Sequence, residues 1–233
     1  MPTTSPKQIS SIPSIWATIQ SNRYLSVAFL GFIILGGVAL YFLQQGDLLL
    51  YFSKNRTLFW NTFFRYGTQL GEEWTYISLL VVFLFIRFRY ALLVPITGVV
   101  VTIISFLSKR FFLHPRPFSY YKTLGTLEDI NVVEGVYLVK GLSSFPSGHT
   151  MSAFAIFTLI ALLLKNKKSM AILLFTLAII VGLSRIYLVQ HFLKDVYLGG
   201  IMGVLIALLI FKIQQLFPIN EDRMIDSKFT FSK

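Results

Sequence analysis

The stretch SRIYLVQHFLKD, residues 184–195, lies between two strongly apolar runs and decides how the rest of the chain is interpreted. Arg185, His191, Lys194 and Asp195 place ionisable side chains at the boundary of these runs. A membrane protein seldom places that many ionisable groups at the end of a span without a use for them. If the segment is helical, Asp195 lies one turn after His191 on the same face. There its carboxylate can hold one imidazole nitrogen and leave the other nucleophilic.

The composition predicts an all-α polytopic membrane protein. Of the 233 residues, 55% are hydrophobic and only 13% are charged, and the mean hydropathy is +0.69. A soluble domain of this size would be more polar. The net charge of +11 would suggest nucleic acid in a soluble protein. Here a positive-inside topology, anionic lipid and a phosphate site explain it, so we expect a lipid bilayer and no nucleic acid as partners.

The residue types that are missing or scarce exclude several kinds of site. The chain has no cysteine, which excludes disulfides, thiolate zinc sites and cysteine-nucleophile phosphatase chemistry. Its three histidines, His114, His149 and His191, are too few to favour a histidine-rich metal cluster. The sequence therefore predicts neither a metal site nor a cofactor.

Six apolar segments are predicted to span the membrane, because crossing the hydrocarbon takes about 20 residues in a helix. The domain organisation follows as a cytoplasmic N-terminal tail over 1–23, a six-span domain over 24–211 and a cytoplasmic C-terminal tail over 212–233. The N-terminal tail carries a possible surface helix near 15–19. The six spans, of which the second is the weakest and must borrow flanking residues, are 24–43, 73–86, 91–107, 149–164, 170–183 and 196–211.

Two connections stand out. In 47–70, aromatic and basic residues are interleaved, which suits the headgroup layer and predicts an interfacial helix after the first span. The alternative is a packed loop between spans. Residues 111–145 form a long polar connection, and connections of this length are often functional.

Charge predicts the orientation. The two short turns are basic, so they should be cytoplasmic, and both termini then lie inside. These basic residues are Arg87, Arg89, Lys165, Lys167 and Lys168. The connections after spans one, three and five then face outward, and they hold all the candidate site residues. The candidate site is therefore expected on the outer side of the membrane.

Three clusters carry the chemistry: Lys109-x6-Arg116-Pro117, Pro146-Ser147-Gly148-His149, and Ser184-Arg185-x5-His191-x3-Asp195. The two arginines can donate bidentate hydrogen bonds to phosphate, and the lysine adds a point charge. The backbone N–H groups of Ser147 and Gly148 and the positive end of the following helix can face an anion. An oxyanion with several negative oxygens needs such a set.

These three motifs resemble those of the type 2 phosphatidic acid phosphatase superfamily, integral-membrane lipid phosphate phosphatases that share a site with vanadium haloperoxidases. The resemblance implies that His191 attacks phosphorus and forms a phosphohistidine, with Asp195 orienting it. His149 would protonate the leaving oxygen and then activate water. The phosphoryl oxygens would be bound by Lys109, Arg116, Ser147, Gly148 and Arg185.

The expected activity is metal-independent hydrolysis of a lipid phosphomonoester or diphosphate. The substrates left open are undecaprenyl diphosphate, phosphatidylglycerophosphate, phosphatidic acid and the phosphates of lipid A. The rival interpretation from another class is an anionic-lipid binding or transport protein without catalysis. Haloperoxidase activity is a third interpretation, disfavoured because those relatives are soluble. The sequence assigns no role to His114, Glu72 or Glu73, and no oligomeric state.

Overall fold

The prediction of an all-α protein is confirmed. The computed structural model describes residues 14–164, 168–217, 219–220 and 223–229, and every regular element in these ranges is helical. The α-helices are α1 (Ile15–Ser21), α2 (Arg23–Phe42), α3 (Asp47–Lys54), α4 (Leu58–Gly67), α5 (Glu73–Leu84), α6 (Phe88–Phe112), α7 (Pro117–Leu124), α8 (Gly148–Leu163), α9 (Lys168–Tyr187) and α10 (Leu193–Gln215). The short 3-10 helices are η1 (Thr68–Gly71), η2 (Leu127–Asp129) and η3 (Met224–Asp226).

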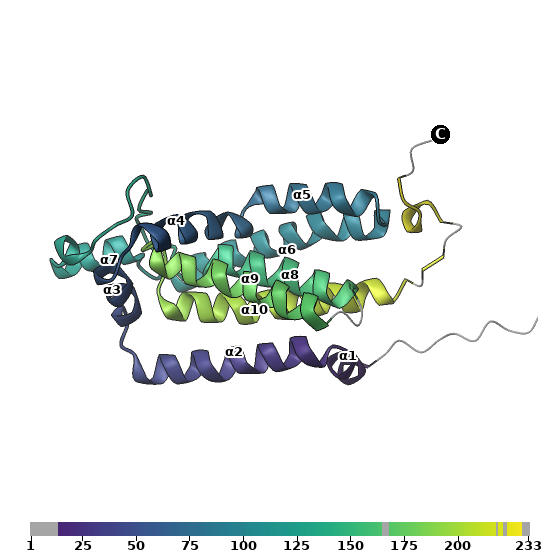
Figure 1. Ribbon diagram of the computed structural model, residues 1–233, viewed down its shortest axis with the longest axis horizontal. Helices are drawn as coiled ribbons and strands as arrows, with labels where there is room; N and C mark the ends of the chain where they lie inside the picture. The colour runs from purple at the N-terminus through teal and green to yellow at the C-terminus, as the bar shows by residue number, and fades with distance from the viewer. Residues whose placement is uncertain (1–13, 165–167, 218, 221–222, 230–233) are drawn as a thin grey trace, which may run out of the picture.

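The bundle is organised around α8. Helices α5, α6, α8, α9 and α10 run along one common direction (Figure 1), and α8 packs against α6, α9 and α10. Residues 153–162 of α8 are all buried. A helix that is apolar on every side is stable only when other elements surround it, which explains its central position.

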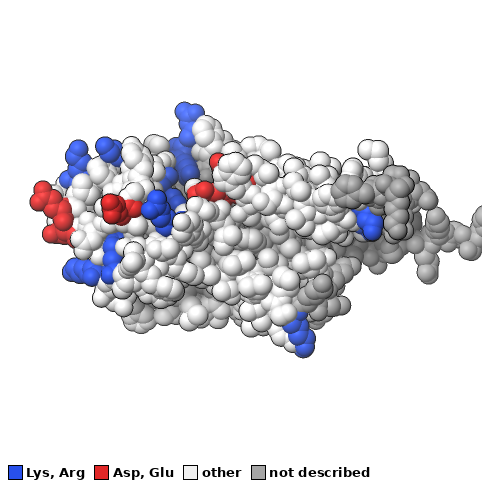
Figure 2. Space-filling view, turned by 45° about the horizontal axis from the view of Figure 1, so that its top comes forward, with Lys and Arg blue, Asp and Glu red and all other residues white. Residues whose placement is uncertain are grey.

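α2 lies along the outside of this bundle (Figure 1). Only 6% of its apolar 18-residue window is buried within the protein. An exposed apolar surface of this length fits the hydrocarbon of a bilayer rather than water. In Figure 2, most charged side chains on the visible face lie at the end of the molecule where α3 and α7 lie, a few basic ones lie towards the other end, and the surface between them is almost free of charge.

All six predicted apolar segments form helices, but they differ in length. Four of the helices are long and apolar enough to cross a membrane, namely α2, α6, α9 and α10. The other two are shorter, with 12 residues in α5 and 16 in α8. At a rise of about 1.5 Å per residue, α5 is shorter than a hydrocarbon layer of about 30 Å. In Figure 1, α4 continues the line of α5 towards the end where α3 and α7 lie. The six-span count itself stays a prediction.

The sequence predicts a single interfacial helix over 47–70. This is wrong, because the segment is divided into the shorter helices α3, α4 and η1. α3 ends at Lys54, and Thr57 then caps α4 by accepting a hydrogen bond from the N–H of Trp60. A threonine in extended conformation is a strong N-cap and therefore starts a new helix. α4 packs against α9, so this part of the segment belongs to the bundle.

The long connection 111–145 contains α7 and η2, which the sequence analysis did not predict. Pro117 occupies the first turn of α7, where its missing N–H costs nothing. Two backbone hydrogen bonds close the connection, from Arg116 N to the carbonyl oxygen of Gly141 (2.8 Å) and from Ser144 N to that of His114 (3.0 Å). They bring the first and second motifs together. The predicted surface helix near 15–19 is α1, and the rest of the expected N-terminal tail, 1–13, lies outside the described residues.

At the other end of the bundle, the segment after α10 folds back on the α5–α6 turn. The Asp226 carboxylate accepts two hydrogen bonds from Arg89, at 2.6 Å to Nε and 2.7 Å to Nη2. Backbone hydrogen bonds from Phe88 to Ser227 and from Phe229 to Leu84, both 2.9 Å, extend the contact. A bidentate arginine–carboxylate pair is among the stronger charge-assisted interactions.

We therefore expect Asp226→Asn to lower the melting temperature of the detergent-purified protein by several degrees. Hydrogen bonds to charged groups contribute about 1.5–3 kcal/mol, and the amide cannot accept at both positions. Differential scanning fluorimetry measures the shift. Glu128→Gln, a charge removal at an exposed position in η2, is the matched control and should have no effect. Equal melting temperatures for Asp226→Asn and the native protein would contradict the assignment.

Candidate active site

The turn between α9 and α10 positions His191. Val189 adopts a left-handed conformation with φ of 59°, which is unfavourable for a β-branched residue and costs about 1–3 kcal/mol. The turn that results lets the N–H groups of Gln190 (2.9 Å) and His191 (3.1 Å) donate to the carbonyl oxygen of Arg185. The histidine ring is thereby held beside the ends of both helices.

Asp195 lies behind His191, as the sequence predicts. Its Oδ2 is 3.4 Å from His191 Nδ1 and also accepts hydrogen bonds from the Ser144 hydroxyl (2.5 Å) and the Phe192 N–H (2.9 Å). Both the aspartate and the histidine are buried. Three donors converging on one oxygen stabilise the ionised carboxylate and fix its direction towards the ring.

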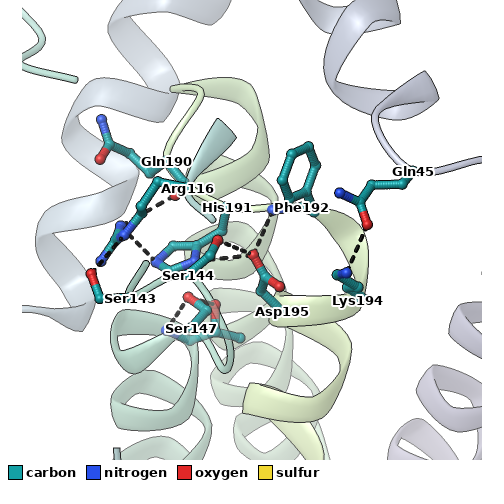
Figure 3. A network of polar contacts seen from close by, with 11 residues as sticks. Gln45, Arg116, Ser143, Ser144, Ser147, Gln190, His191, Phe192, Lys194 and Asp195 are labelled. Atoms are coloured by element: carbon teal, nitrogen blue, oxygen red, sulfur yellow. Dashed lines mark hydrogen bonds and ion pairs between the residues drawn. The ribbon is translucent and has the colours of Figure 1, made fainter. Parts of the chain in front are cut away.

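Arg116 lies on the opposite side of the ring (Figure 3). Its Nη1 is 3.2 Å from His191 Nε2 and 3.2 Å from the carbonyl oxygen of Gln190, while Nε donates to the Ser143 hydroxyl at 3.3 Å. Arg116 can only donate, and Asp195 can only accept when ionised. These partners select the tautomer with the proton on Nδ1 and the lone pair on Nε2, facing the guanidinium.

His191 is neutral at physiological pH. Burial lowers the pKa of His191 to about 3, with Arg116 and Arg185 acting in the same direction, whereas the hydrogen bond to Asp195 acts in the opposite direction. A neutral imidazole with its lone pair on Nε2 is a nucleophile.

The second motif forms the start of α8. Ser147 is its N-cap, and its hydroxyl oxygen accepts from the N–H (3.4 Å) and the hydroxyl (2.8 Å) of Thr150. The expectation that the Ser147 N–H faces an anion is wrong, because this N–H donates to the main-chain carbonyl oxygen of Asp195 at 2.9 Å. A Cβ on Gly148 would lie 3.4 Å from Lys109 Nζ, so the glycine leaves room for this ammonium group beside the helix N-terminus.

Arg185 completes the set of cations. It is buried, and its Nη1 donates to the Thr68 hydroxyl at 2.7 Å. Among the described residues, its Nε has no hydrogen-bond partner. A buried N–H group of a guanidinium without a partner is unfavourable unless a ligand satisfies it.

His149 lies at the mouth of a cavity of about 520 Å³ between α5, α6 and α8. Lys109 and Gly148 line the same end of the cavity, and Tyr76, Val101 and Phe106 line it along the helices. The cavity therefore joins charged groups of the site to the apolar flank of the bundle.

The structure brings all eight predicted site residues to one end of the bundle, and their roles stay predictions. Sequence reasoning missed Ser144, Thr68 and the carbonyl group of Gln190. Nothing in the sequence distinguishes Ser144 from the neighbouring Ser143, and Thr68 belongs to a segment that the sequence predicts to be interfacial.

His114 is part of the 111–145 connection and not of the site, and its ring stacks on that of Phe145 with 5.1 Å between the centroids. Within the described ranges, no three His, Asp or Glu side chains cluster as metal ligands would.

The lowered pKa of His191 predicts a pH-dependent stability. In the unfolded chain the imidazole has its ordinary pKa of 6.5, whereas in the folded site its pKa is about 3. The stabilisation is therefore complete above pH 6.5 and is lost as the pH falls, by about 2 kcal/mol at pH 5. Melting temperatures between pH 7 and 5 should fall less in His191→Asn than in the native protein. An equally steep fall in both proteins would contradict the neutral, buried imidazole.

Known proteins share this arrangement. The family model described as "PAP2 superfamily" matches residues 88–218. Phosphatidylglycerophosphatase B of Bacillus subtilis (strain 168) is 40% identical over 29% of this chain and 37% of its own length. Undecaprenyl-diphosphatase BcrC of the same organism is 30% identical over 55% of this chain and 60% of its own length. This chain thus spans less than two thirds of the length of these curated relatives.

Two solved structures are similar over nearly their whole length. Aquifex aeolicus LpxE has a TM-score of 0.58 and 27% identity, covering 73% of this chain and 96% of its own. The PAP2-type phosphatidylglycerolphosphate phosphatase from Bacillus subtilis has a TM-score of 0.60 and 23% identity, covering 84% of this chain and 98% of its own, and so supports the fold. With a family match over more than half of its length and all three motifs at one end of a helical membrane bundle, the chain belongs to the PAP2 superfamily.

Proposed function

We propose that this protein is a membrane lipid phosphatase that hydrolyses a phosphomonoester or diphosphate headgroup through a phosphohistidine on His191. The geometry around His191 carries the proposal: a neutral imidazole with its Nε2 lone pair 3.2 Å from Arg116 and its Nδ1 turned to Asp195. The proposal is also supported by its similarity to relatives named as phosphatidylglycerophosphatase and undecaprenyl-diphosphatase.

In the first step, His191 Nε2 attacks phosphorus and the bond from phosphorus to the leaving oxygen breaks. His149 gives its proton to that oxygen, because an alkoxide is a poor leaving group, and such general-acid catalysis contributes about 10²–10⁴-fold. Asp195 balances the positive charge that develops on the attacking ring. In the second step, His149 takes a proton from water, the water oxygen bonds to phosphorus and the N–P bond breaks, releasing phosphate.

The cations of the site take the place that Mg²⁺ has in other phosphoryl-transfer enzymes. The unpartnered Nε of Arg185 and the guanidinium of Arg116 suit phosphoryl oxygens, while Lys109 and the N–H of Gly148 complete the cradle. Fixed positive charge at the equatorial oxygens stabilises the transition state without reorganisation. We expect activity without a metal ion or another cofactor.

The lipid reaches the site from the side. The cavity between α5, α6 and α8 begins at Lys109 and His149 and continues along apolar residues, including Val101 and Phe106. This arrangement suits a headgroup that enters the charged end while its chains stay among the helices. The site lies at the opposite end from the basic α5–α6 turn, so we assign it to the outer face of a bacterial-type cytoplasmic membrane, with both termini inside.

We expect detergent-purified protein in EDTA to release phosphate from at least one of four lipids: undecaprenyl diphosphate, phosphatidylglycerophosphate, phosphatidic acid and lipid A. His191→Ala should abolish release, because it removes the atom that attacks phosphorus. Full activity in EDTA and no stimulation by Mg²⁺ would agree with a site in which arginine and lysine side chains replace the metal ion. A protein that binds these lipids equally well with or without His191 and never releases phosphate would instead be a binding or transport protein.

Gly148→Ala should lower kcat/KM, but by less than the roughly 10²-fold that a displacement of about 1 Å causes. The added Cβ would lie 3.0 Å from Ser105 Oγ, which must give way, and 3.4 Å from Lys109 Nζ, where it takes up the space beside the ammonium group. Gly31→Ala is the matched control, because nothing lies within 4 Å of a Cβ there. Unchanged kinetics for Gly148→Ala would contradict the assignment of Lys109 and Gly148 to phosphate binding.

A further inference from the structure

One short segment, residues 68–72, contacts the site at three points. Thr68 accepts the hydrogen bond from Arg185. A Cβ on Gly71 would lie 2.9 Å from the carbonyl oxygen of His149, so only glycine allows the backbones to approach this closely. Glu72 follows, with its Oε1 3.6 Å from His149 Nε2. The segment between α4 and α5 thus reaches both a phosphate-binding residue and the proposed general acid.

The Glu72 carboxylate is directed at the site rather than at its own helix. Glu72 is the N-cap of α5, where acidic side chains commonly accept hydrogen bonds from the first turn. Within the described part of the chain, its side chain makes no such capping bond. The side chains of His149 and Glu72 are 36% and 32% exposed, so both remain accessible from the cavity.

His149 needs a counter-charge to act as an acid. It faces positive groups from several elements: Lys109 of α6, Arg116 before α7, Arg185 of α9 and the His191 ring. It also lies in the first turn of α8, where the helix dipole disfavours a cation. The carboxylate of Glu72, with its Oε1 3.6 Å from His149 Nε2, has the sign of charge that opposes this repulsion. It also interacts with Arg185.

We propose that Glu72 is the positioning residue of His149: it holds the protonated imidazole through Nε2 and leaves Nδ1–H for the leaving oxygen. The inference rests on the proposed phosphatase function. In the first step the proton moves from Nδ1 to the leaving oxygen as the P–O bond breaks, and in the second it returns to Nδ1 from water. Glu72 stays ionised throughout, so the site contains two histidine–carboxylate pairs, His191–Asp195 for attack and His149–Glu72 for proton transfer.

The experiment compares Glu72→Gln with the native protein on two substrates, the best lipid of the panel and 4-nitrophenyl phosphate. An alkoxide leaving group needs the proton, whereas 4-nitrophenolate leaves without it near pH 7. We expect kcat on the lipid to fall about 10–100-fold, as for other residues that orient a reacting histidine. The first-turnover release of 4-nitrophenolate, which reports the first step alone, should fall less than about threefold. Glu72→Asp should restore part of the lipid activity, and the alkaline limb of the lipid pH–rate profile should move to lower pH in Glu72→Gln.

Two controls separate this role from a structural one. Glu73→Gln removes the same charge from the wall of the same cavity, one residue further on, and should leave the ratio of the two activities unchanged. His149→Ala should show the same selective loss in the first turnover, and adding Glu72→Gln to it should cause no further loss. Equal losses on both substrates, an unmoved pH–rate profile or additive losses in the double variant would each overturn the role of Glu72. Absence of turnover by the native protein, or full activity of His191→Ala, would instead refute the proposed function and with it this inference.

Discussion

The site depends on Asp195 more than on any other residue, because this residue joins parts of the chain that are distant in sequence. Its carboxylate accepts hydrogen bonds from Ser144 and Phe192 and contacts His191, while its main-chain carbonyl oxygen accepts the N–H of Ser147. The start of α10 is thereby fixed to the start of α8 and to the end of the 111–145 connection. A buried carboxylate is stable only when such donors surround it. The contacts that converge on Oδ2 of Asp195 therefore also align the candidate nucleophile His191.

The electrostatics of the site are unfavourable for an empty protein and favourable for an anion. Lys109, Arg116 and Arg185 lie close enough to repel one another, and Arg185 keeps a buried Nε without a partner among the described residues. Bringing like charges together in a poorly solvated place lowers stability. A bound anion would relieve this repulsion and satisfy the open donor of Arg185. Local violations of this kind are typical of functional sites, where stability is given up for binding.

The sequence allowed the helical class, the positions of the six apolar segments and the gathering of the eight candidate site residues at one end of the bundle to be predicted. The apolar runs are long, and His191 and Asp195 are only four residues apart, so they lie together although His191 is in the turn before α10 and not in a helix. Long-range contacts could not be predicted in the same way. Nothing near Ser144 or Thr68 indicates that one would contact Asp195 and the other Arg185. The break at Thr57 also depends on a single capping side chain within an otherwise continuous aromatic pattern.

Packing inside the membrane domain sets the geometry of the site at its end. A Cβ on Gly199 of α10 would lie 2.7 Å from the carbonyl oxygen of Ser147, so the two helices touch backbone to backbone next to the histidine. Small residues at helix contacts are the usual route to close packing in membranes. Most of the candidate site residues are therefore held on helix ends, which position side chains more rigidly than loops do, while His191 lies in the turn before α10. Of the eight candidates, only Arg116 comes from the connection that contains α7. The 111–145 connection is thus the part of the surroundings that can change most freely, because loops accept changes that a packed helix contact does not.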